Sequence, residues 1–439
     1  MKQRLVALPV SGDAFFFQRN GRAILVDSGG SGRLLGNLLD KYVPTVTRID
    51  VAVCTHADSD HAGGFTSLLD HWRPQGISPH NLIGEFWLPG AWVPVIRHLL
   101  IEANKLANAL IEELEKVRSK SLDIPQKEDD IDLIADKLDQ QIWPASQENK
   151  HIHLDDIERE RIDDIYQTEL YDLREPEWRE PEWMKELRTN AKQILGHRLR
   201  SARALESARR RVRYRRKRGY IGSTLAKYWL SLIDTADRIR KIATCAIEHN
   251  IRIRWFDFSE FQNTGEAKGG NRGFLVPINA VEQTPAKPSD AIHLLSFCLS
   301  VLNRQCLSFY VPQLKYLPGV LFCGDSPMGS GSKCSSPFPF FSCRTYWPIF
   351  VTAPHHGADS CEIAYQHINK WAGPENVIWL RSGGLKRHPE NAYRNLPTNR
   401  RFCTYCPHKK LNPTPIDMDF VEGRWPFFLV LASGHRCYC

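Results

Sequence analysis

The sequence lacks any hydrophobic run long enough to cross a membrane, which requires about 18 to 20 consecutive apolar residues. Its first residues, MKQRLVALPVSGDAFFF, also lack the apolar core of a secretory signal. The excess of positive over negative charge is small, because the net charge is only +8 over 439 residues. Of these residues, 25% are charged and 42% are hydrophobic. These values exclude a disordered, collagen-like or coiled-coil chain, and they predict a folded cytoplasmic protein without a membrane partner.

Disulfide bonds are not expected either, although the chain has 12 cysteines. A large chain without a secretion signal stays in a compartment where thiols are reduced. Most of the cysteines, such as Cys54 and Cys306, lie in apolar runs and predict buried thiols. Four near the C-terminus are spaced as two pairs, Cys403 with Cys406 and Cys437 with Cys439. Two such pairs outline a structural zinc site, and the alternative is that they are ordinary thiols.

Two β-rich segments flank a long helical stretch. Two apolar runs around Asn20-Gly21 predict a β-hairpin with a type I′ turn, and IDVAVCT at 49–55 predicts a buried strand. Residues 96–250 contain long charged segments with helical periodicity, and short apolar runs typical of strands return from residue 251. We therefore predict one α/β domain, formed by residues 1–95 and 251–439 and interrupted by a helical insertion at 96–250.

The strongest chemical signal directly follows the predicted strand at 49–55. Four potential metal ligands occur there within six residues: His56, Asp58, Asp60 and His61. Imidazole nitrogens and carboxylates are natural ligands of zinc and similar divalent ions, and a strand-to-helix turn can aim them at one point. The alternative is that the two aspartates only cap the following helix.

Three later apolar strands also end in potential ligands: Gly324-Asp325, Pro354-His355-His356-Gly357 and His388-Pro389. With the turn Asp27-Ser28-Gly29-Gly30, this ordered set resembles the metallo-β-lactamase fold superfamily. Within it, the set is similar to the ComEC-type branch, the hydrolase domain of bacterial DNA-uptake channels, here as a soluble stand-alone member.

The resemblance implies a four-layer αββα sandwich with two divalent metal ions, zinc or manganese. The implied ligands are His56, Asp58 and His355 at one metal, Asp60, His61 and His388 at the other, and Asp325 as a bridge. Asp60 would hold the attacking hydroxide, and His356, or His388 if it is not a ligand, would donate a proton to the leaving oxygen. Whether His355 or His356 is the ligand stays open at this point. The family's separate middle-strand histidine has only His80 and His293 as nearby candidates.

The substrate is indicated by a basic run in the insertion. It consists of Arg209, Arg210, Arg211, Arg213, Arg215, Arg216, Lys217 and Arg218, with Tyr214 between them. Phosphate backbones attract such runs, although acidic stretches of the same insertion could pair with it instead. We therefore expect a phosphodiesterase, most specifically a nuclease. The alternatives are a thioester or lactone hydrolase, or an interaction protein of a multi-protein system such as anti-phage defence, docked through the insertion.

Overall fold

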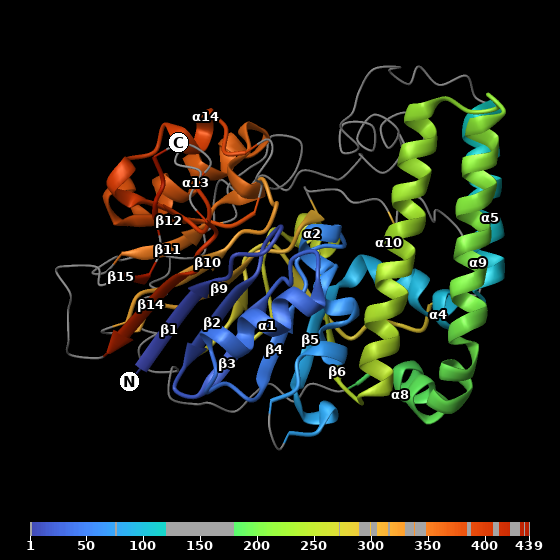
Figure 1. Ribbon diagram of the computed structural model, residues 1–439, viewed down its shortest axis with the longest axis horizontal. Coiled ribbons are helices and arrows are strands. Elements are labelled where there is room, and N and C mark those ends of the chain that lie inside the picture. Colours follow the sequence, from blue (N-terminus) through green and yellow to red (C-terminus); the bar gives the residue numbers. More distant parts are fainter. Residues whose placement is uncertain are drawn as a thin grey trace.

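The computed structural model describes residues 2–74, 77–119, 180–271, 273–288, 305–314, 317–329, 348–383, 388–406, 412–421, 431–433 and 435–438, with residues 299 and 338. Two β-sheets face each other, and helices cover the outer face of each sheet (Figure 1). The first sheet has the strand order β15-β14-β1-β2-β3-β4-β5-β6-β8, and the second has the order β16-β13-β12-β11-β10-β9-β7. This is the predicted αββα sandwich.

The strands are β1 (Lys2–Ala7), β2 (Phe15–Arg19), β3 (Arg22–Val26), β4 (Ile49–Val53), β5 (Ile83–Pro89), β6 (Arg252–Asp257), β7 (Val276–Pro277), β8 (Val281–Gln283), β9 (Phe309–Val311), β10 (Val320–Phe322), β11 (Ile349–Thr352), β12 (Val377–Arg381), β13 (Arg401–Cys403), β14 (Ile416–Val421), β15 (Leu431–Ser433) and β16 (His435–Arg436). The helices are α1 (Gly32–Tyr42), α2 (Ser59–Ala62), α3 (Leu68–His71), α4 (Val93–Ile101), α5 (Ala103–Ser119), α8 (Glu182–Thr189), α9 (Ala191–Lys217), α10 (Ser223–Glu248), α11 (Phe258–Thr264), α13 (Glu362–Ala372) and α14 (Asn391–Arg394). Short 3-10 turns include η1 (Gly64–Thr66), η2 (Pro79–Asn81), η3 (Gly90–Trp92), η7 (Pro354–Gly357), η8 (Asp359–Cys361), η9 (Pro374–Asn376) and η10 (Thr398–Arg400).

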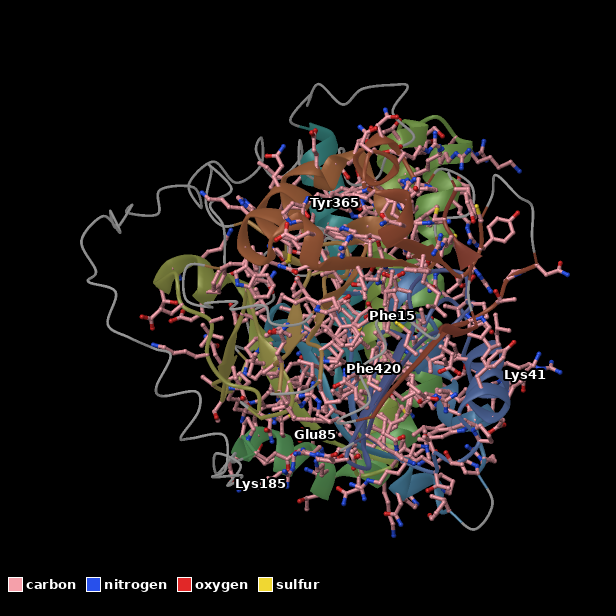
Figure 2. All side chains as sticks on the ribbon, turned by 90° about the vertical axis from the view of Figure 1, so that its left-hand side faces the viewer. Phe15, Lys41, Glu85, Lys185, Tyr365 and Phe420 are labelled. Atoms are coloured by element: carbon pink, nitrogen blue, oxygen red, sulfur yellow. The ribbon has the colours of Figure 1, made fainter. Side chains whose placement is uncertain are left out.

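The alternation of side chains along the strands produces the layers. On β2, Phe15 and Phe17 face the space between the sheets, whereas Phe16 faces the helices outside the first sheet. On β12, Leu380 lies between the sheets, and Trp379 packs against the helices outside the second sheet. Figure 2 shows Phe15 in the centre of the molecule. The apolar side chains thus form three buried clusters, one between the sheets and one outside each sheet. Each fully buried large apolar side chain contributes about 1.5 to 3 kcal/mol, so these clusters supply most of the stabilisation.

The predicted hairpin is confirmed. β2 and β3 pair in antiparallel register around Asn20 and Gly21, whose φ angles are 51° and 84°. Both values are positive, as a type I′ turn requires, and asparagine and glycine tolerate them best. The predicted strand at 49–55 is β4, which ends at Val53.

The helices between β5 and β6 pack on the first sheet. β5 and β6 are parallel neighbours, and α4, α5, α8, α9 and α10 lie between them in the chain. Apolar side chains of these helices belong to the same buried cluster as β1 to β6. Residues 120–179 of the predicted insertion lie outside the described residues, and its boundaries at 95 and 250 stay a prediction. Among the helices of the described part, none combines the length and the apolar composition that crossing a membrane requires.

Candidate metal centre

The predicted ligands meet at one edge of the two sheets. Asp27 follows β3 and His56 follows β4, both at the carboxyl ends of parallel strands of the first sheet. Asp325, His355 and His388 follow β10, β11 and β12 of the second sheet, which are also parallel to one another. Carboxyl ends of parallel strands are where loops converge in open α/β sheets. The centre therefore lies between the two sheets at this edge.

His61 and Asp325 oppose each other through atoms that both accept hydrogen bonds. Nδ1 of His61 lies 2.8 Å from Oδ2 of Asp27, so this nitrogen carries the proton. The lone pair on Nε2 then faces Oδ1 of Asp325 at 3.1 Å. Both atoms are buried, and neither has a hydrogen-bond partner among the described residues. Two buried acceptors at this distance fit a cation held between them.

His56 repeats this arrangement. Its Nδ1 lies 3.0 Å from the hydroxyl of Thr55, which itself donates to Asp27, so His56 Nδ1 is the donor. Its buried Nε2 then faces Oδ2 of Asp58 at 3.7 Å and Oδ2 of Asp325 at 3.6 Å. The ring centroids of His56 and His61 are 4.2 Å apart. Ligand atoms of His56, His61 and Asp325 all lie within 4.8 Å of one another, so these donors are close enough to hold divalent metal.

The electrostatics of these histidines and carboxylates also supports a metal site. Burial alone would lower the pKa of His61, but Asp325 and Asp27 raise it well above its ordinary value. Burial would raise the pKa of Asp325, yet the histidines around it, His61 first, hold it well below its ordinary value. Without another cation, the buried carboxylates can be balanced only by protonated histidines. Divalent ions would balance the negative charge of the carboxylates while the histidine rings stay neutral.

The two histidines of η7 adopt an unusual backbone. His355 and His356 have φ angles of 46° and 53°, in the left-handed region that costs a non-glycine residue about 1 to 2 kcal/mol. Such strain concentrates at functional sites. The turn directs both rings toward the centre: Nε2 of His355 lies 3.7 Å from Oδ2 of Asp325, and its Nδ1 lies 3.2 Å from Oγ of Ser360.

His356 lies between two aspartates. Its Nδ1 is 3.1 Å from Oδ1 of Asp13 and 3.1 Å from the carbonyl oxygen of Ser382, so Nδ1 is protonated. Its Nε2 is 3.1 Å from Oδ2 of Asp60. Burial would lower the pKa of His356, but Asp13 and Asp60 raise it well above its ordinary value. Ligand atoms of Asp13, His61 and His356 also lie within 4.8 Å of one another.

His388 makes no ion pair with an aspartate among the described residues, and its Nδ1 lies 4.0 Å from Oε1 of Glu390. Its ring centroid is 5.3 Å from that of His355 and 6.3 Å from that of His356. Burial and then the positive charge of His355 lower its pKa to about 4, which leaves a neutral ring. Of these rings, His356 is the one that contacts Asp60, the residue expected to share a metal with His388.

Asp58 shows that the cluster is more than a helix cap. Asp58 occupies the N-cap position of α2, but its side chain makes no capping hydrogen bond. Its carboxylate faces His56 instead. The capping alternative therefore does not account for Asp58.

Three contributors to the centre were not recognised in the sequence. Asp13 follows Gly12, whose φ is 97° and whose position would place a Cβ atom 1.8 Å from the carbonyl oxygen of Asp60. Cys306 was expected only as a buried thiol, and its sulfur accepts the backbone N–H of Asp325 at 3.1 Å. Arg238 reaches the centre from α10, where its Nε donates to the carbonyl of Ala57 at 2.7 Å. Only the glycine before Asp13 signals a special turn in the sequence.

The basic run of α9 divides into two groups. Arg209 pairs with Asp234 at 2.6 Å and Asp237 at 3.3 Å, and Arg211 and Arg215 contact residues of α5. These three arginines hold helices together. The others form an exposed surface, here called the α9 basic surface: Arg210, Arg213, Arg216, Lys217 and Arg218. The run therefore serves both packing and the surface, which its spacing alone does not reveal.

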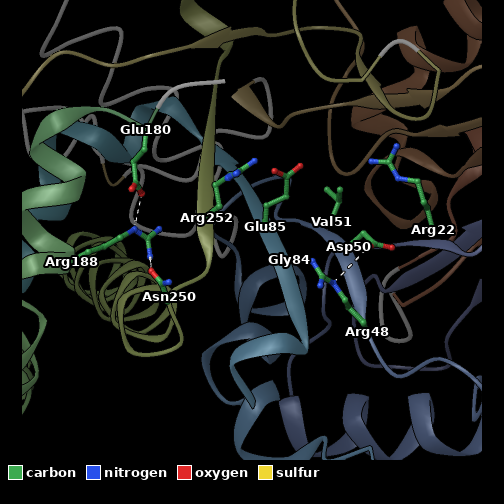
Figure 3. Close-up of a pocket in the computed structure, with 10 residues that line it drawn as sticks. All are labelled: Arg22, Arg48, Asp50, Val51, Gly84, Glu85, Glu180, Arg188, Asn250 and Arg252. Carbon is green, nitrogen blue, oxygen red and sulfur yellow. Dashed lines mark hydrogen bonds and ion pairs between the residues drawn. The ribbon is translucent and has the colours of Figure 1, made fainter. Parts of the chain in front are cut away.

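Other candidates lie away from the centre. His80 belongs to η2 before β5, at the opposite edge of the sheet, where its ring neighbours that of His249. It does not supply the missing histidine, and His293 lies outside the described residues. A cavity of about 570 Å³ also opens at that opposite edge, as Figure 3 shows. It is lined by four arginines and three carboxylates, for example Arg48 with Asp50 at 3.5 Å, so its charges nearly balance.

The comparison with protein families agrees with this geometry. Residues 7–156 match the model described as the metallo-beta-lactamase superfamily. The match includes His56 to His61. Asp325, His355 and His388 lie beyond it in the sequence, and the fold brings them to the same edge of the sheets. The search of curated proteins found no match to the chain. Over residues 7–156 the chain is therefore similar to the metallo-beta-lactamase superfamily, and this similarity and the ligand clusters support a domain of that superfamily with the general character of a metal-dependent hydrolase.

Proposed function

We propose that this hydrolase cleaves phosphodiesters and acts as a nuclease. The observation that carries the proposal is the exposed α9 basic surface, because the metal centre alone suits phosphoryl and carbonyl substrates equally. Five cationic side chains on one helix end attract a phosphate backbone through counterion release. The similarity to the ComEC-type branch points to the same class of substrate.

The α9 basic surface and the metal centre are joined by α10. Arg238 of α10 contacts Ala57 beside the ligands, and Ser223 begins the helix 15 residues earlier. At about 1.5 Å per residue, that half of α10 extends roughly 22 Å. Figure 1 shows α9 and α10 side by side, rising past α2. About six base pairs of a duplex, at about 3.4 Å each, would bridge this distance.

Two groups of residues would hold the metal ions. The first comprises His56, Asp58, His355 and Asp325, and the second comprises Asp60, His61 and Asp325. Divalent ions in such sites activate water as a nucleophile and stabilise the negative charge that develops on a phosphoryl oxygen. Asp27 and Thr55 fix the proton on Nδ1 of His61 and His56, so that each Nε2 is available for a metal.

His356 is placed to manage the proton of the leaving group. In the reaction, a water oxygen forms a bond to phosphorus as the water gives up one proton to the solvent, and the bond from phosphorus to the leaving sugar oxygen breaks. The proton on Nε2 of His356 goes to that oxygen, and Nε2 then takes up a proton from the solvent. Asp13 accepts from Nδ1 at 3.1 Å and stabilises the protonated ring, as a carboxylate behind a catalytic histidine does.

Arg238 supports a phosphate substrate at the centre itself. Its guanidinium lies near the negative charges of Asp58 and Asp60, and burial lowers its pKa. A guanidinium stays protonated in proteins at neutral pH. Its Nε and Nη2 donate to Ala57 and Thr235, and Nη1 has no hydrogen-bond partner in the part of the chain that the structure describes. A guanidinium with a remaining donor is suited to a phosphate oxygen.

The test is cleavage of single- and double-stranded DNA and RNA by protein loaded with manganese or zinc. We expect cleavage that disappears in the Asp60→Ala, His61→Ala double variant. Wild-type protein that cleaves none of these substrates with either metal would contradict the proposal. Turnover of a thioester or lactone by such a protein would favour the alternative substrate class.

The role of the α9 basic surface has its own test. The variant Arg210→Gln, Arg213→Gln, Arg216→Gln, Lys217→Gln should raise KM for DNA about tenfold and reduce the salt dependence of binding by about three to four charges. Hydrolysis of bis(4-nitrophenyl) phosphate should not change. The matched control is Lys192→Gln, Arg200→Gln, Arg203→Gln, at exposed positions in the first half of α9. Equal losses in both variants would assign no special role to this surface.

Protein partners on the helical insertion, for example in an anti-phage system, are a further part of the proposal. Trp183 of α8 does not support docking, because it is buried and its Nε1 donates to the carbonyl of Pro285 at 3.0 Å. Such partners would use exposed positions of the described helices, for example those of α9. Co-purification with genomic neighbours, compared between the full chain and the α9 glutamine variant, tests this role.

A further inference from the structure

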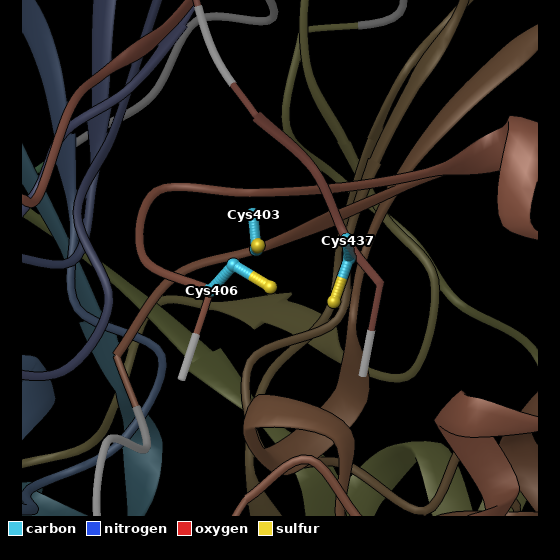
Figure 4. A group of neighbouring side chains, drawn as sticks. All are labelled: Cys403, Cys406 and Cys437. Atoms are coloured by element: carbon cyan, nitrogen blue, oxygen red, sulfur yellow. The ribbon is translucent and has the colours of Figure 1, made fainter. Parts of the chain in front are cut away.

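We infer that Cys403, Cys406 and Cys437 bind one zinc ion at a structural site that is separate from the catalytic centre. Their side chains come together although the third lies about 30 residues beyond the second in the sequence. Figure 4 shows the three side chains directed toward one another. Cys439, the expected fourth ligand, lies outside the described residues.

The distances suit a single metal ion. All three sulfur atoms lie within 4.8 Å of one another, and all three residues are fully buried. Thiolates around a tetrahedral zinc at about 2.3 Å stand about 3.8 Å apart. A multi-iron cluster would hold its thiolates farther apart, since each binds a different iron. Thiolates also prefer zinc to manganese or magnesium, so the site would take zinc whichever metal serves catalysis.

Sheet pairing brings the three thiols together. Cys403 ends β13, and Cys406 follows in the turn after it. β16 pairs with β13 in antiparallel register, which places Cys437 opposite Arg401, two residues before Cys403, and its backbone N–H donates to the carbonyl of Arg401 at 2.9 Å. β16 comprises only His435–Arg436 at the sheet edge. So short an edge strand contributes little pairing, and a shared zinc ion would fasten it.

The turn that carries the thiols is also connected to the catalytic metal centre. Arg381, at the end of β12, donates from Nη2 to the carbonyl of Tyr405 at 2.6 Å, within the turn that carries the thiols. The next residue, Ser382, provides the carbonyl that accepts from His356. Zinc at the cysteines would therefore stabilise the loop that positions His356.

The experiment is metal analysis of the purified full chain. The His61→Ala, Asp325→Ala variant removes the main ligands of the catalytic centre, and we expect it to retain about one zinc ion per chain. Adding Cys406→Ser and Cys437→Ser should remove this ion, whereas adding Cys245→Ser should not. Cys245 is a matched control because it is a partly buried free thiol on α10.

A second measurement covers the case in which the serine variant fails to fold. The His61→Ala, Asp325→Ala protein with cobalt in place of zinc should show a thiolate-to-cobalt charge-transfer band, since only the cysteine site remains. Absence of the band, absence of bound zinc, or a disulfide among these cysteines in protein kept reduced during purification would overturn the inference. These results do not depend on the substrate, so they are separate from the failure of the proposed nuclease activity.

Discussion

The carboxylate of Asp27 lies 2.8 Å from the ring of His61, Oδ2 to Nδ1, and this contact decides which ring nitrogen faces Asp325. Oδ1 and Oδ2 of Asp27 also accept from the backbone N–H and hydroxyl of Thr55, at 2.8 Å each. One buried aspartate therefore orients both histidine ligands after β4, since Thr55 in turn contacts His56. Asp27 itself is not placed to bind the metal.

Asp27→Asn should lower metal affinity about 10- to 100-fold, because an amide can donate to Nδ1 and reverse the tautomer of His61. Competition with a zinc chelator measures the change. Asp40→Asn, at an exposed position of α1, is the control and should bind metal like the wild type. Unchanged affinity in Asp27→Asn would mean that the orientation of His61 does not depend on Asp27.

Asp325 should matter more for metal content than either histidine of η7. Its Oδ1 faces His61, and its Oδ2 faces His56 and His355, so its carboxylate spans both ligand groups. Asp325→Ala should lose at least one of two catalytic metal ions and nearly all activity, whereas His355→Ala should lose at most one ion. Metal analysis after gel filtration measures both variants. Asp325→Ala protein that holds two ions and keeps wild-type turnover would exclude the bridging role.

The sequence predicts those parts of the candidate metal centre whose residues are adjacent in the chain. His56 to His61 stand out because a strand, four ligand types and two glycines follow one another within a few residues. Asp325 and His355 follow apolar strands in the same way. The sequence also predicts the hairpin at Asn20 and the layered fold, since both depend on period-two patterns and on turn residues.

Long-range pairings had no such signal. Asp13 and His356 are 343 residues apart and meet only because both sheets close around the centre. Arg238 contacts Ala57 across 181 residues, from a helix that looked like part of a separate insertion. The basic run also looked uniform, and only packing against α5 and α10 separates Arg209 from Arg213. Local pattern therefore names candidate ligands, whereas Asp13 and Arg238 are recognised only when the fold brings them beside these ligands.

His356 as a proton donor predicts a dependence on the leaving group. His356→Gln should reduce DNA cleavage about 10²- to 10⁴-fold, because the sugar oxygen leaves as a strong base and needs the proton. Hydrolysis of bis(4-nitrophenyl) phosphate should fall less than about tenfold, since nitrophenolate leaves without protonation. Asp13→Asn should show the same contrast in weaker form. Equal losses on both substrates, with a loss of metal, would instead make His356 a ligand.

Gly12 should be intolerant of any side chain. A Cβ atom there would meet the carbonyl oxygen of Asp60 at 1.8 Å, and the φ of 97° is strained for other residues. Gly12→Ala should lower the melting temperature and the metal affinity together. Gly196→Ala is the matched control, because Gly196 lies within α9 with open space around it. The control should stabilise the protein by about 0.5 to 1 kcal/mol through helix propensity. Equal melting temperatures in the two variants would contradict the close approach at Gly12.

Arg238 tests whether the helical insertion takes part in the reaction. Arg238→Gln should lower kcat/KM about 10- to 100-fold for both DNA and bis(4-nitrophenyl) phosphate, a loss of about 1.4 to 2.7 kcal/mol in transition-state binding. The reason is that Arg238 stands beside Asp58 and Asp60 with a donor left for a phosphate oxygen. Arg238→Lys should recover only part of the activity, because an ammonium group lacks the planar fork of donors. Metal content should stay at the wild-type value, and Arg203→Gln, exposed on α9, should behave as the wild type. If Arg238→Gln turns over both substrates at the wild-type rate, Arg238 only fastens α10 to Ala57, and the α9 basic surface would be the insertion's sole contact with the substrate.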